Sequence, residues 1–460
     1  MDASAAGGDL PFVAYYPEGY AHDGINEFVP ITNNSDEEVR FELHARYETG
    51  ERDQLVASGV IAPHSRGGVT LNAADRPEER LVRKDVPYAL ELRASAPVGA
   101  TMSHYDFGTA IGESFTTTTD IEWTFAEGYK DPENTRDFLV FYNPGERDAH
   151  VAVVIYSADG RAFPLVSTVG AGRRGGGNIN EEASIPFGGF TVQVVSSEPI
   201  VAAMSRYDLR GGRGAGFIGT PGGGATAGVL PSVTFDADNR GETDPELDAQ
   251  SYIGLLNTDQ VHTANVTLRF LPLNGEPEVP DMTVAVPPQV RGGVSIRDLN
   301  LPPGQYGIAY RSDIPITATS SVYQGRDGTG MESIIDASTR WEFGEGFMSP
   351  ARAGKTVTEN LNLYNPGGEA VDVTVDFSFS DGTVHTLTRR LEARAAATVA
   401  IHEIPEVAAL GYDSFYGIRV SADEPIAASF EHWDDDLGGG FATPGTPTGE
   451  IRPISEIASA

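Results

Sequence analysis

Apolar and polar residues alternate along the chain in short runs. From Val371 to Phe379 every second residue is apolar and the residues between are polar, and residues 151–155 repeat this pattern. A period of two is typical of a β-strand with one buried and one solvated face, which is common in antiparallel sheets. No stretch of twelve or more residues has a helical stripe with caps, and short helical turns fit only residues 75–82 and 404–410. The pattern predicts an all-β protein.

A short phrase recurs along the chain at a fixed spacing. It pairs glutamate with glycine and then an aromatic residue, and its glycines Gly19, Gly128 and Gly346 lie 109 and 218 residues apart, one period and then two. The missing copy would lie near residue 237, where residues 235–238 are degenerate. Self-similarity at a fixed period indicates a repeat architecture.

Further markers follow the phrase in the same order in each copy. A turn asparagine comes first, then a turn glycine, and then an arginine within an alternating strand, which the fourth copy replaces by Ala396. In chain order these markers are Asn33, Asn143, Asn257 and Asn365; Gly50, Gly160, Gly275 and Gly382; and Arg66, Arg174 and Arg291. Asn and Gly favour turns because both tolerate positive φ.

The last marker is a proline followed eight residues later by an aromatic residue. The aromatic residues are Tyr105, Tyr207, Tyr323 and Trp433; the residues before them are His104, Arg206, Val322 and His432; and those after them are Asp106, Asp208, Gln324 and Asp434. The repeated order predicts four units of about 110 residues, with domains at 1–119, 120–231, 232–339 (with a degenerate start) and 340–460.

About seven short strands in each such unit favour four tandem antiparallel β-sandwich (Ig-like) domains. The joints between the units are short, in residues 116–120, in the Gly-rich tract 222–231 and near Ser338. Short joints imply that neighbouring domains touch, and we expect them to form a rod or an arc.

The second unit resembles a known family. Trp123 to Tyr129, the strand ending in Asn143, Asp148 to Val151, and Pro199 through Asp208 are similar to the sensory rhodopsin transducer family, and a similar Ala-Glu-Gly phrase occurs in tandem repeats of bacterial surface proteins. The resemblance implies a β-sandwich that self-associates, with a role in binding a sugar or another small ligand. Four fused units and the heavy acidity depart from a single-domain signalling adaptor.

The repeated aromatic position supports two interpretations. In the first, a binding cleft uses a row of these side chains, with the aromatic ring stacking on a sugar and the aspartate accepting hydroxyls. Its candidate ligand-binding residues are His104, Tyr105, Asp106, Arg206, Tyr207, Asp208, Tyr323, His432, Trp433 and Asp434. In the second, strand alternation puts the aromatic residue in the core, while His104 and Asp106 face water.

Other polar motifs predict little chemistry. Glu18, Glu127 and Glu345 recur with the repeat, so we expect one structural hydrogen bond per domain from them. The calcium-loop pattern in residues 236–247 fails because Arg240 and Leu247 stand where carboxylates or asparagine are required. No histidine pair has metal-ligand spacing. We therefore predict no cofactor and no catalytic or metal-binding residues, and keep structural calcium between domains as an alternative.

Charge limits the partners. The 460 residues include 66 Asp and Glu against 32 Lys and Arg, a net charge of −34, and no Cys. The absence of a basic surface argues against binding to nucleic acid or to anionic lipid. The sequence contains no run of 18 apolar residues, so we predict no membrane-spanning segment. Without Cys there is no disulfide scaffold, thiol nucleophile or cysteine-based zinc site.

These observations predict a non-enzymatic structural or adhesive protein that self-associates into a surface layer, filament or matrix. The alternative is an array of modules that bind carbohydrate or another small ligand. The first nine residues have no basic segment followed by an apolar stretch, as a signal peptide would. The protein is then either intracellular or present as a mature form, and we expect an extracellular or cell-surface location.

Overall fold

A computed structural model describes residues 9–459 except 49, 51, 236–249, 274, 276, 300, 325–326, 349–356, 409–413 and 435–438. Strands dominate, and every pairing between them is antiparallel apart from one isolated bridge between Ala21 and Lys84. The predicted all-β fold class is confirmed. The expected helical turns correspond to a 3-10 turn at Pro77–Glu79 and to α1 (Pro405–Ala408), and α2 (Ile454–Ile457) lies near the C-terminal end.

The strands fall into four consecutive groups, here called units 1 to 4, because hydrogen-bonded sheets join strands only within a group. Unit 1 comprises β1 (Phe12–Tyr16), β2 (Asn26–Asn33), β3 (Val39–Tyr47), β4 (Gln54–Ile61), β5 (Ser65–Asn72), β6 (Tyr88–Ala94), β7 (Gly99–Asp106) and β8 (Thr109–Ser114). Unit 2 comprises β9 (Asp120–Phe125), β10 (Tyr129–Lys130), β11 (Thr135–Asn143), β12 (Ala149–Ser157), β13 (Ala162–Val169), β14 (Arg173–Asn178), β15 (Gly188–Asp208), β16 (Arg213–Ile218) and β17 (Thr220–Pro221).

The second half of the chain repeats this plan. Unit 3 comprises β18 (Ala225–Phe235), β19 (Gln250–Leu256), β20 (Ala264–Pro272), β21 (Met282–Val286), β22 (Arg291–Ser295), β23 (Gly304–Gln324) and β24 (Asp327–Glu332). Unit 4 comprises β25 (Asp336–Phe343), β26 (Phe347–Met348), β27 (Val357–Tyr364), β28 (Val371–Phe379), β29 (Val384–Leu391), β30 (Ala396–Ala400), β31 (Ser414–Asp434), β32 (Phe441–Pro444), β33 (Thr446–Pro447) and β34 (Ile451–Pro453).

Two of the predicted domain ends fall inside strands. Position 231 lies within β18, which pairs with β23 of unit 3, and position 339 lies within β25, which pairs with β31 of unit 4. The Gly-rich tract 222–231 extends into β18, so the composition shift lies in the first strand of unit 3 and not between two units. Independent folding of the four units stays a prediction.

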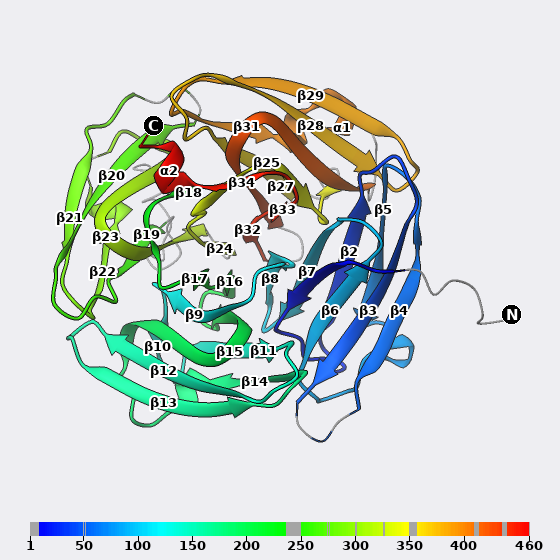
Figure 1. Cartoon of the computed structure of the whole chain (residues 1–460), viewed down its shortest axis with the longest axis horizontal. Coiled ribbons are helices and arrows are strands. Elements are labelled where there is room, and N and C mark those ends of the chain that lie inside the picture. Colours follow the sequence, from blue (N-terminus) through cyan, green and yellow to red (C-terminus); the bar gives the residue numbers. More distant parts are fainter. Residues whose placement is uncertain are drawn as a thin grey trace, which may run out of the picture.

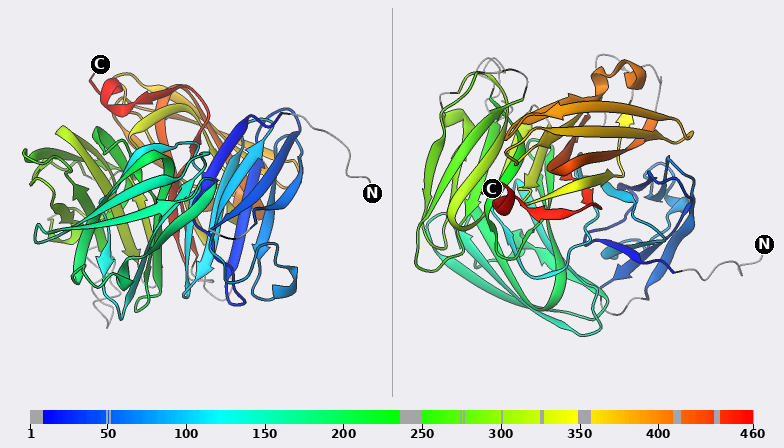
Figure 2. Two further views of the ribbon diagram at one scale, coloured as in Figure 1. Left: turned by 60° about the horizontal axis from the view of Figure 1, so that its bottom comes forward. Right: turned by 45° about the horizontal axis from the view of Figure 1, so that its top comes forward.

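The four units close into a ring, so the expected rod or arc is wrong (Figure 1). Unit 4 contacts unit 1 directly. Asn34 Nδ2 of unit 1 donates to Glu342 Oε2 of unit 4 at 2.6 Å, and Ser114 N of unit 1 donates to Thr443 Oγ1 of unit 4 at 2.7 Å. Strands β8, β16, β24 and β32 contact one another around the centre. The tilted views in Figure 2 show the units side by side around this centre. Ring closure could not be predicted from short joints, because a joint constrains only adjacent units.

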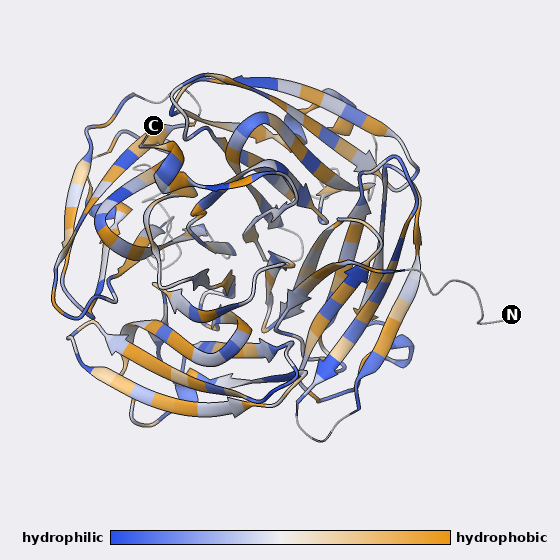
Figure 3. Cartoon of the chain, in the orientation of Figure 1, coloured by the Kyte–Doolittle hydropathy of each residue, from blue (hydrophilic) through white to orange (hydrophobic). Residues whose placement is uncertain are grey.

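Each unit has its own apolar core. Four large clusters of buried apolar residues follow the units in order, and the cluster of unit 4 extends into unit 3 through Val229, Leu271 and Met331. In Figure 3 hydrophobic and hydrophilic residues alternate along the outer strands, as on β28, whose burial also alternates over its first residues. The strand alternation seen in the sequence therefore marks the outer sheets, each of which has one solvated face.

The repeated asparagine performs the same task in all four units. Asn33, Asn143, Asn257 and Asn365 are each at most 1% exposed. Each Nδ2 donates to backbone carbonyls across the turn, as from Asn143 to Arg147 O at 2.7 Å, and each Oδ1 accepts a backbone N–H two residues on. A buried amide that satisfies several turn carbonyls explains why this position repeats.

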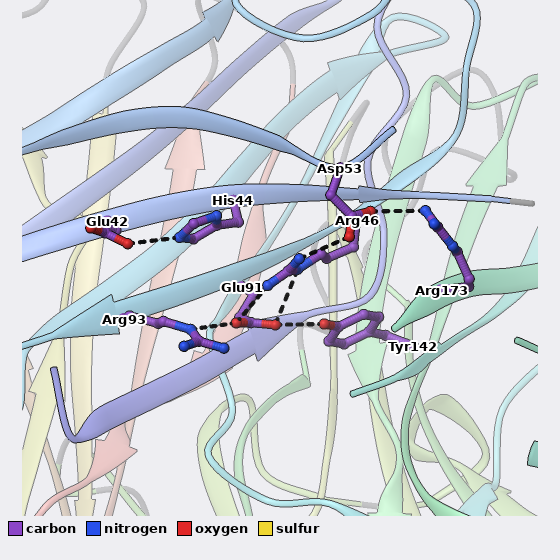
Figure 4. A network of polar contacts seen from close by, with 8 residues as sticks. All are labelled: Glu42, His44, Arg46, Asp53, Glu91, Arg93, Tyr142 and Arg173. Carbon is purple, nitrogen blue, oxygen red and sulfur yellow. Dashed lines mark hydrogen bonds and ion pairs between the residues drawn. The ribbon is translucent and has the colours of Figure 1, made fainter. Parts of the chain in front are cut away.

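Polar contacts also join neighbouring units. At the boundary between units 1 and 2, Glu91 accepts from Arg46 and Arg93 of unit 1 and from Tyr142 of unit 2, the last at 2.6 Å (Figure 4). Asp53 bridges Arg46 and Arg173 of unit 2. Although burial opposes it, hydrogen bonds from Arg46 and Tyr142 lower the pKa of Glu91 to about 2.

Candidate binding site between units 1 and 4

A cavity of about 850 Å³ lies where the ring closes. Its unit 1 wall is the sheet β5-β2-β7, and unit 4 contributes β26 together with both ends of β31. The lining includes Tyr105 and Asp106 from the end of β7 and His432 and Asp434 from the end of β31. Four of the ten predicted ligand-binding residues therefore meet in one cavity, although about 330 residues of chain separate the two pairs.

Arg66 on β5 is the cation of this cavity. Its side chain is 14% exposed, its Nη2 lies 3.8 Å from Glu345 Oε2, and its guanidinium carbon lies 4.6 Å from the centre of the Phe415 ring. Burial lowers the pKa of Arg66. Among the described residues its buried Nε–H has no acceptor. A buried donor without an acceptor costs free energy, which a ligand acceptor would recover.

Unit 4 contributes an acidic and an aromatic wall. Glu345, from the repeated Glu-Gly phrase, accepts from Ser103 Oγ of unit 1 at 3.1 Å. Phe347 and Phe415 pack with ring centres 5.0 Å apart. Opposite them on unit 1, Phe28 and Tyr105 also line the cavity. The cavity thus combines several aromatic rings with carboxylates and one guanidinium.

His432 is held in place by a buried cross-strand pair. Its Nδ1 lies 2.8 Å from Glu359 Oε1, and its ring stacks on Phe441 at 5.2 Å. The same carboxylate accepts from Phe347 N and from the Tyr416 hydroxyl. Burial lowers the pKa of His432, but the hydrogen bond to Glu359 and nearby carboxylates outweigh it and raise the pKa.

Carboxylates outnumber guanidinium groups in the lining of this cavity. The lining holds Asp106, Glu345 and Asp434 but only one guanidinium. Burial raises the pKa of the Tyr105 hydroxyl, and the charges of Glu345 and Asp434 raise it further. Next to the cavity, burial raises the pKa of Asp327 to about 7. Such a site favours a neutral ligand rich in hydroxyl donors, or a cationic one, over an anion.

The predicted alternation at the aromatic position is wrong in unit 1 and unit 4. His104 and His432 are 3% and 2% exposed, whereas Tyr105 and Trp433 are only half-buried. The reason is that β7 and the end of β31 lie between their own unit and a neighbouring unit, so both of their faces are covered. Tyr207 and Tyr323 are buried, as the second interpretation expects.

The predicted row of ligand-binding residues does not lie along one cleft. His104 lies inside unit 1, with Nδ1 3.0 Å from Glu27 Oε1. Arg206 pairs with the buried Glu127 and lies 3.9 Å from Asp137 Oδ1. Arg206, Tyr207, Asp208, Tyr323 and Trp433 do not line the cavity between units 1 and 4.

The residue before each aromatic belongs to a cross-strand pair that the repeat markers did not reveal. His104 faces Glu27, Arg206 faces Asp137, and His432 faces Glu359 in the strand register. In unit 3 the opposed residues are Val322 and Ser251, so both charges are absent together. Comparing the repeats pair by pair, rather than marker by marker, would have found this signal.

The repeated glutamate contacts the following unit rather than its own domain alone. Glu18 accepts from Ser205 of unit 2, Glu127 from Arg291 of unit 3 at 2.8 Å, and Glu345 from Ser103 of unit 1. The repeated arginine pairs with this glutamate across two boundaries, Arg291 with Glu127 and Arg66 with Glu345, whereas Arg174 of unit 2 pairs with Glu48 of unit 1. Between units 3 and 4 the phrase is degenerate and Ala396 replaces the arginine, so both partners are lost at the same boundary.

The described residues contain no group of three or more His, Asp or Glu side chains that could hold a metal ion. The calcium-loop candidates at 236–247, and Asp435 and Asp436 beside Asp434, lie outside the described residues. In the part of the chain that the structure describes, no helix is long and apolar enough to cross a membrane.

The fold defines a class of all-β proteins built from repeated antiparallel units. The chain belongs to the family of unknown function DUF5719, whose model matches residues 117–358. No curated protein matches the chain. The matched range begins near the start of unit 2 and extends into unit 4.

Solved structures give weaker similarities. The Anabaena sensory rhodopsin transducer is 32% identical, with 18% of this chain and 94% of that chain covered and a TM-score of 0.17. The Thermotoga maritima protein 1070 is 15% identical, with 25% and 98% covered and a TM-score of 0.22. A tetra-tandem repeat from the extending region of a large adhesion protein is 11% identical, with 92% of each chain covered and a TM-score of 0.11.

Proposed function

We propose that this protein binds a small hydroxylated ligand, a saccharide, without catalysing its conversion, and that the cavity between units 1 and 4 is the site. The observation that carries the proposal is the meeting of Tyr105 and Asp106 with His432 and Asp434 in one cavity. Aromatic rings that stack on the apolar face of a sugar, next to carboxylates that accept its hydroxyls, are an arrangement suited to carbohydrates.

The dimensions and charges of the site support this ligand class. A volume of about 850 Å³ lies within the range of about 300–1,000 Å³ for small-molecule sites. Phe28, Tyr105, Phe347 and Phe415 supply apolar surface, while Asp106 and Asp434 supply acceptors. Arg66 has an unused Nε–H for a ligand oxygen. The excess of carboxylates disfavours acidic sugars.

The test is isothermal titration of the full chain with glucose, galactose, N-acetylglucosamine, glucosamine and glucuronic acid. We expect saturable binding of a neutral or amino sugar, and weaker or no binding of glucuronic acid. Tyr105→Ala removes the stacking ring and Asp106→Asn removes a charged acceptor, so each is expected to weaken binding at least tenfold.

Asp208→Asn is the matched control, because Asp208 has the same repeat position in unit 2 and does not line the cavity. It is expected to bind like the wild type. The proposal is wrong if the folded wild-type chain binds none of the five sugars, or if Asp106→Asn and Asp208→Asn have the same affinity.

Self-association into a layer, filament or matrix is the second candidate, and one feature favours it. Strands β4 and β13 each end a sheet, and exposed apolar side chains lie on them, with Val166 86% exposed and Val60 56% exposed. Unpaired sheet edges of this kind can pair between molecules. Head-to-tail stacking through the unit ends is disfavoured, because ring closure already buries them. This candidate is excluded if the wild-type chain stays monomeric at millimolar concentration and the Val166→Lys variant has the same oligomeric state.

A further inference from the structure

A second, smaller cavity lies between units 3 and 4 and is lined by arginines. It has a volume of about 250 Å³, and its lining includes Arg269, Arg311 and Arg394 together with Thr267, Asp281 and Tyr364. Acidic residues are in large excess in this chain, where 66 Asp and Glu outnumber 32 Lys and Arg. Three guanidinium groups around one small cavity are therefore an unusual concentration of positive charge.

The strand register explains how two of these arginines meet. Thr267 on β20 faces Arg311 on β23, and Arg269 faces Ala309. Arg269 and Arg311 are thus diagonal neighbours on one sheet face, at a Cα separation of about 7–8 Å. Like charges at this spacing repel each other, so the arrangement costs stability unless an anion lies between them.

The third arginine comes from the neighbouring unit. Arg394 lies in the turn between β29 and β30 with φ +58°, and its backbone N–H donates to Gly367 O at 3.1 Å. Tyr364, which is 8% exposed, lines the same cavity. Burial raises the pKa of Tyr364, while the charges of Arg269, Arg311 and Arg394 oppose the rise, which places all three near its hydroxyl.

The arginines are poorly neutralised. Among the described residues none of the three forms an ion pair, although Asp281 also lines the cavity, and Arg311 donates to the backbone carbonyl of Ala458. All three side chains belong to exposed residues, so a solute can reach them. Arginine's planar fork of donors matches the oxygens of phosphate and sulfate.

We propose that the cavity lined by Arg269, Arg311, Arg394 and Tyr364 is a binding site for a tetrahedral oxyanion, phosphate or sulfate, free or carried as an ester on a larger ligand. The anion would join β20 and β23 of unit 3 to the β29–β30 turn of unit 4. It would neutralise this boundary, which lacks the repeated glutamate and arginine that pair between units 2 and 3 and between units 4 and 1. The site is independent of the saccharide cavity, which lies on the other side of unit 4.

The test titrates the full chain with sodium phosphate, sodium sulfate, sodium acetate, glucose 6-phosphate and glucose at constant ionic strength, using calorimetry and thermal unfolding. We expect saturable binding of phosphate or sulfate, with a rise in Tm because the anion binds only the folded boundary. Tighter binding of glucose 6-phosphate than of free phosphate would identify an ester ligand, and the reverse order would identify the free ion. Acetate and glucose are expected to bind at least tenfold more weakly.

Arg269→Gln and Arg394→Gln are expected to weaken phosphate binding at least tenfold, and both sites are exposed, so folding is retained. Arg147→Gln, at another exposed arginine in unit 2, is the control and is expected to bind like the wild type. Tyr105→Ala is expected to retain phosphate binding, which separates this proposal from the saccharide site. The absence of saturable binding in the wild type, or equal binding by Arg269→Gln and Arg147→Gln, would overturn the proposal.

Discussion

Single residues explain why the Glu-Gly-aromatic phrase repeats. A Cβ atom built on Gly19, Gly128 or Gly346 would lie 2.2–2.3 Å from the ring of Tyr88, Phe190 or Tyr416. In each of these three units the carbonyl oxygen of this glycine also accepts the backbone N–H of that aromatic residue. The glycine is therefore required by close packing of the phrase on a ring, and not by a turn with positive φ.

Gly128→Ala is expected to lower the free energy of unfolding by about 1–3 kcal/mol, because the added methyl must displace the Phe190 ring in a packed core. Gly177→Ala is the matched control in the same unit, since a Cβ there meets no atom within 4 Å. Urea denaturation of both variants measures the difference. Equal stability of the two would contradict the packing explanation.

At the scale of elements, the cross-strand pairs determine the interior of the ring. β2 with β7, and β27 with β31, each bury an acid opposite a histidine, whereas β19 with β23 places Ser251 opposite Val322. Removing one member of a buried pair leaves an uncompensated charge, and removing both does not. The neutral pair of unit 3 shows that this fold tolerates the double replacement.

A double-mutant cycle on Glu27 and His104 tests this. Each single variant, Glu27→Ser or His104→Val, is expected to lose about 3 kcal/mol of stability. The combined variant, which reproduces the unit 3 pair, is expected to lose less than the two losses together by about 2 kcal/mol. Additive losses in chemical denaturation would show that the two residues do not stabilise each other.

For the whole molecule, ring closure is the property on which the candidate saccharide site depends. A Cβ on Gly417 of unit 4 would lie 1.8 Å from Thr32 Oγ1 of unit 1, and its three nearest atoms all belong to Thr32. Gly417→Val is therefore expected to open the boundary between units 4 and 1, increase the radius of gyration in X-ray scattering and abolish saccharide binding. Gly368→Val, whose Cβ meets no atom within 4 Å, is the control and is expected to scatter like the wild type.

Buried titratable groups give the ring a pH dependence. Burial raises the pKa of several carboxyls, to about 7 for Glu18, Asp137, Asp327 and Glu431 and to about 8 for Glu332. An acid with a raised pKa stabilises the fold below its unfolded pKa, and this contribution is lost as pH rises through the folded pKa. Histidines with a raised pKa, His104 and His432, act in the same direction.

The free energy of unfolding is therefore expected to fall by several kcal/mol between pH 5 and pH 8. Each group contributes about 1.4 kcal/mol for every unit by which its pKa is raised, if the groups titrate independently of one another. Urea denaturation at each pH unit measures it. Self-repulsion among the net −34 charges acts in the same direction and is screened by salt. The decline should persist in 0.5 M NaCl if the buried groups cause it, and a stability maximum at pH 8 would contradict the assignment.

The sequence by itself determined the strands, the turns and the repeat, because these depend on local periodicity and on residues such as Asn143 whose partners lie nearby in the chain. It also placed Tyr105, Asp106, His432 and Asp434 among the candidate site residues. Only the tertiary structure decided which of them meet, because ring closure brings β7 of unit 1 to the end of β31 in unit 4. Three further features depend on surfaces that neighbouring units cover: the burial of His104, the inter-unit contact of Glu345 and the convergence of Arg269 with Arg394. Strand periodicity does not predict them, because it does not indicate which strand faces another unit covers.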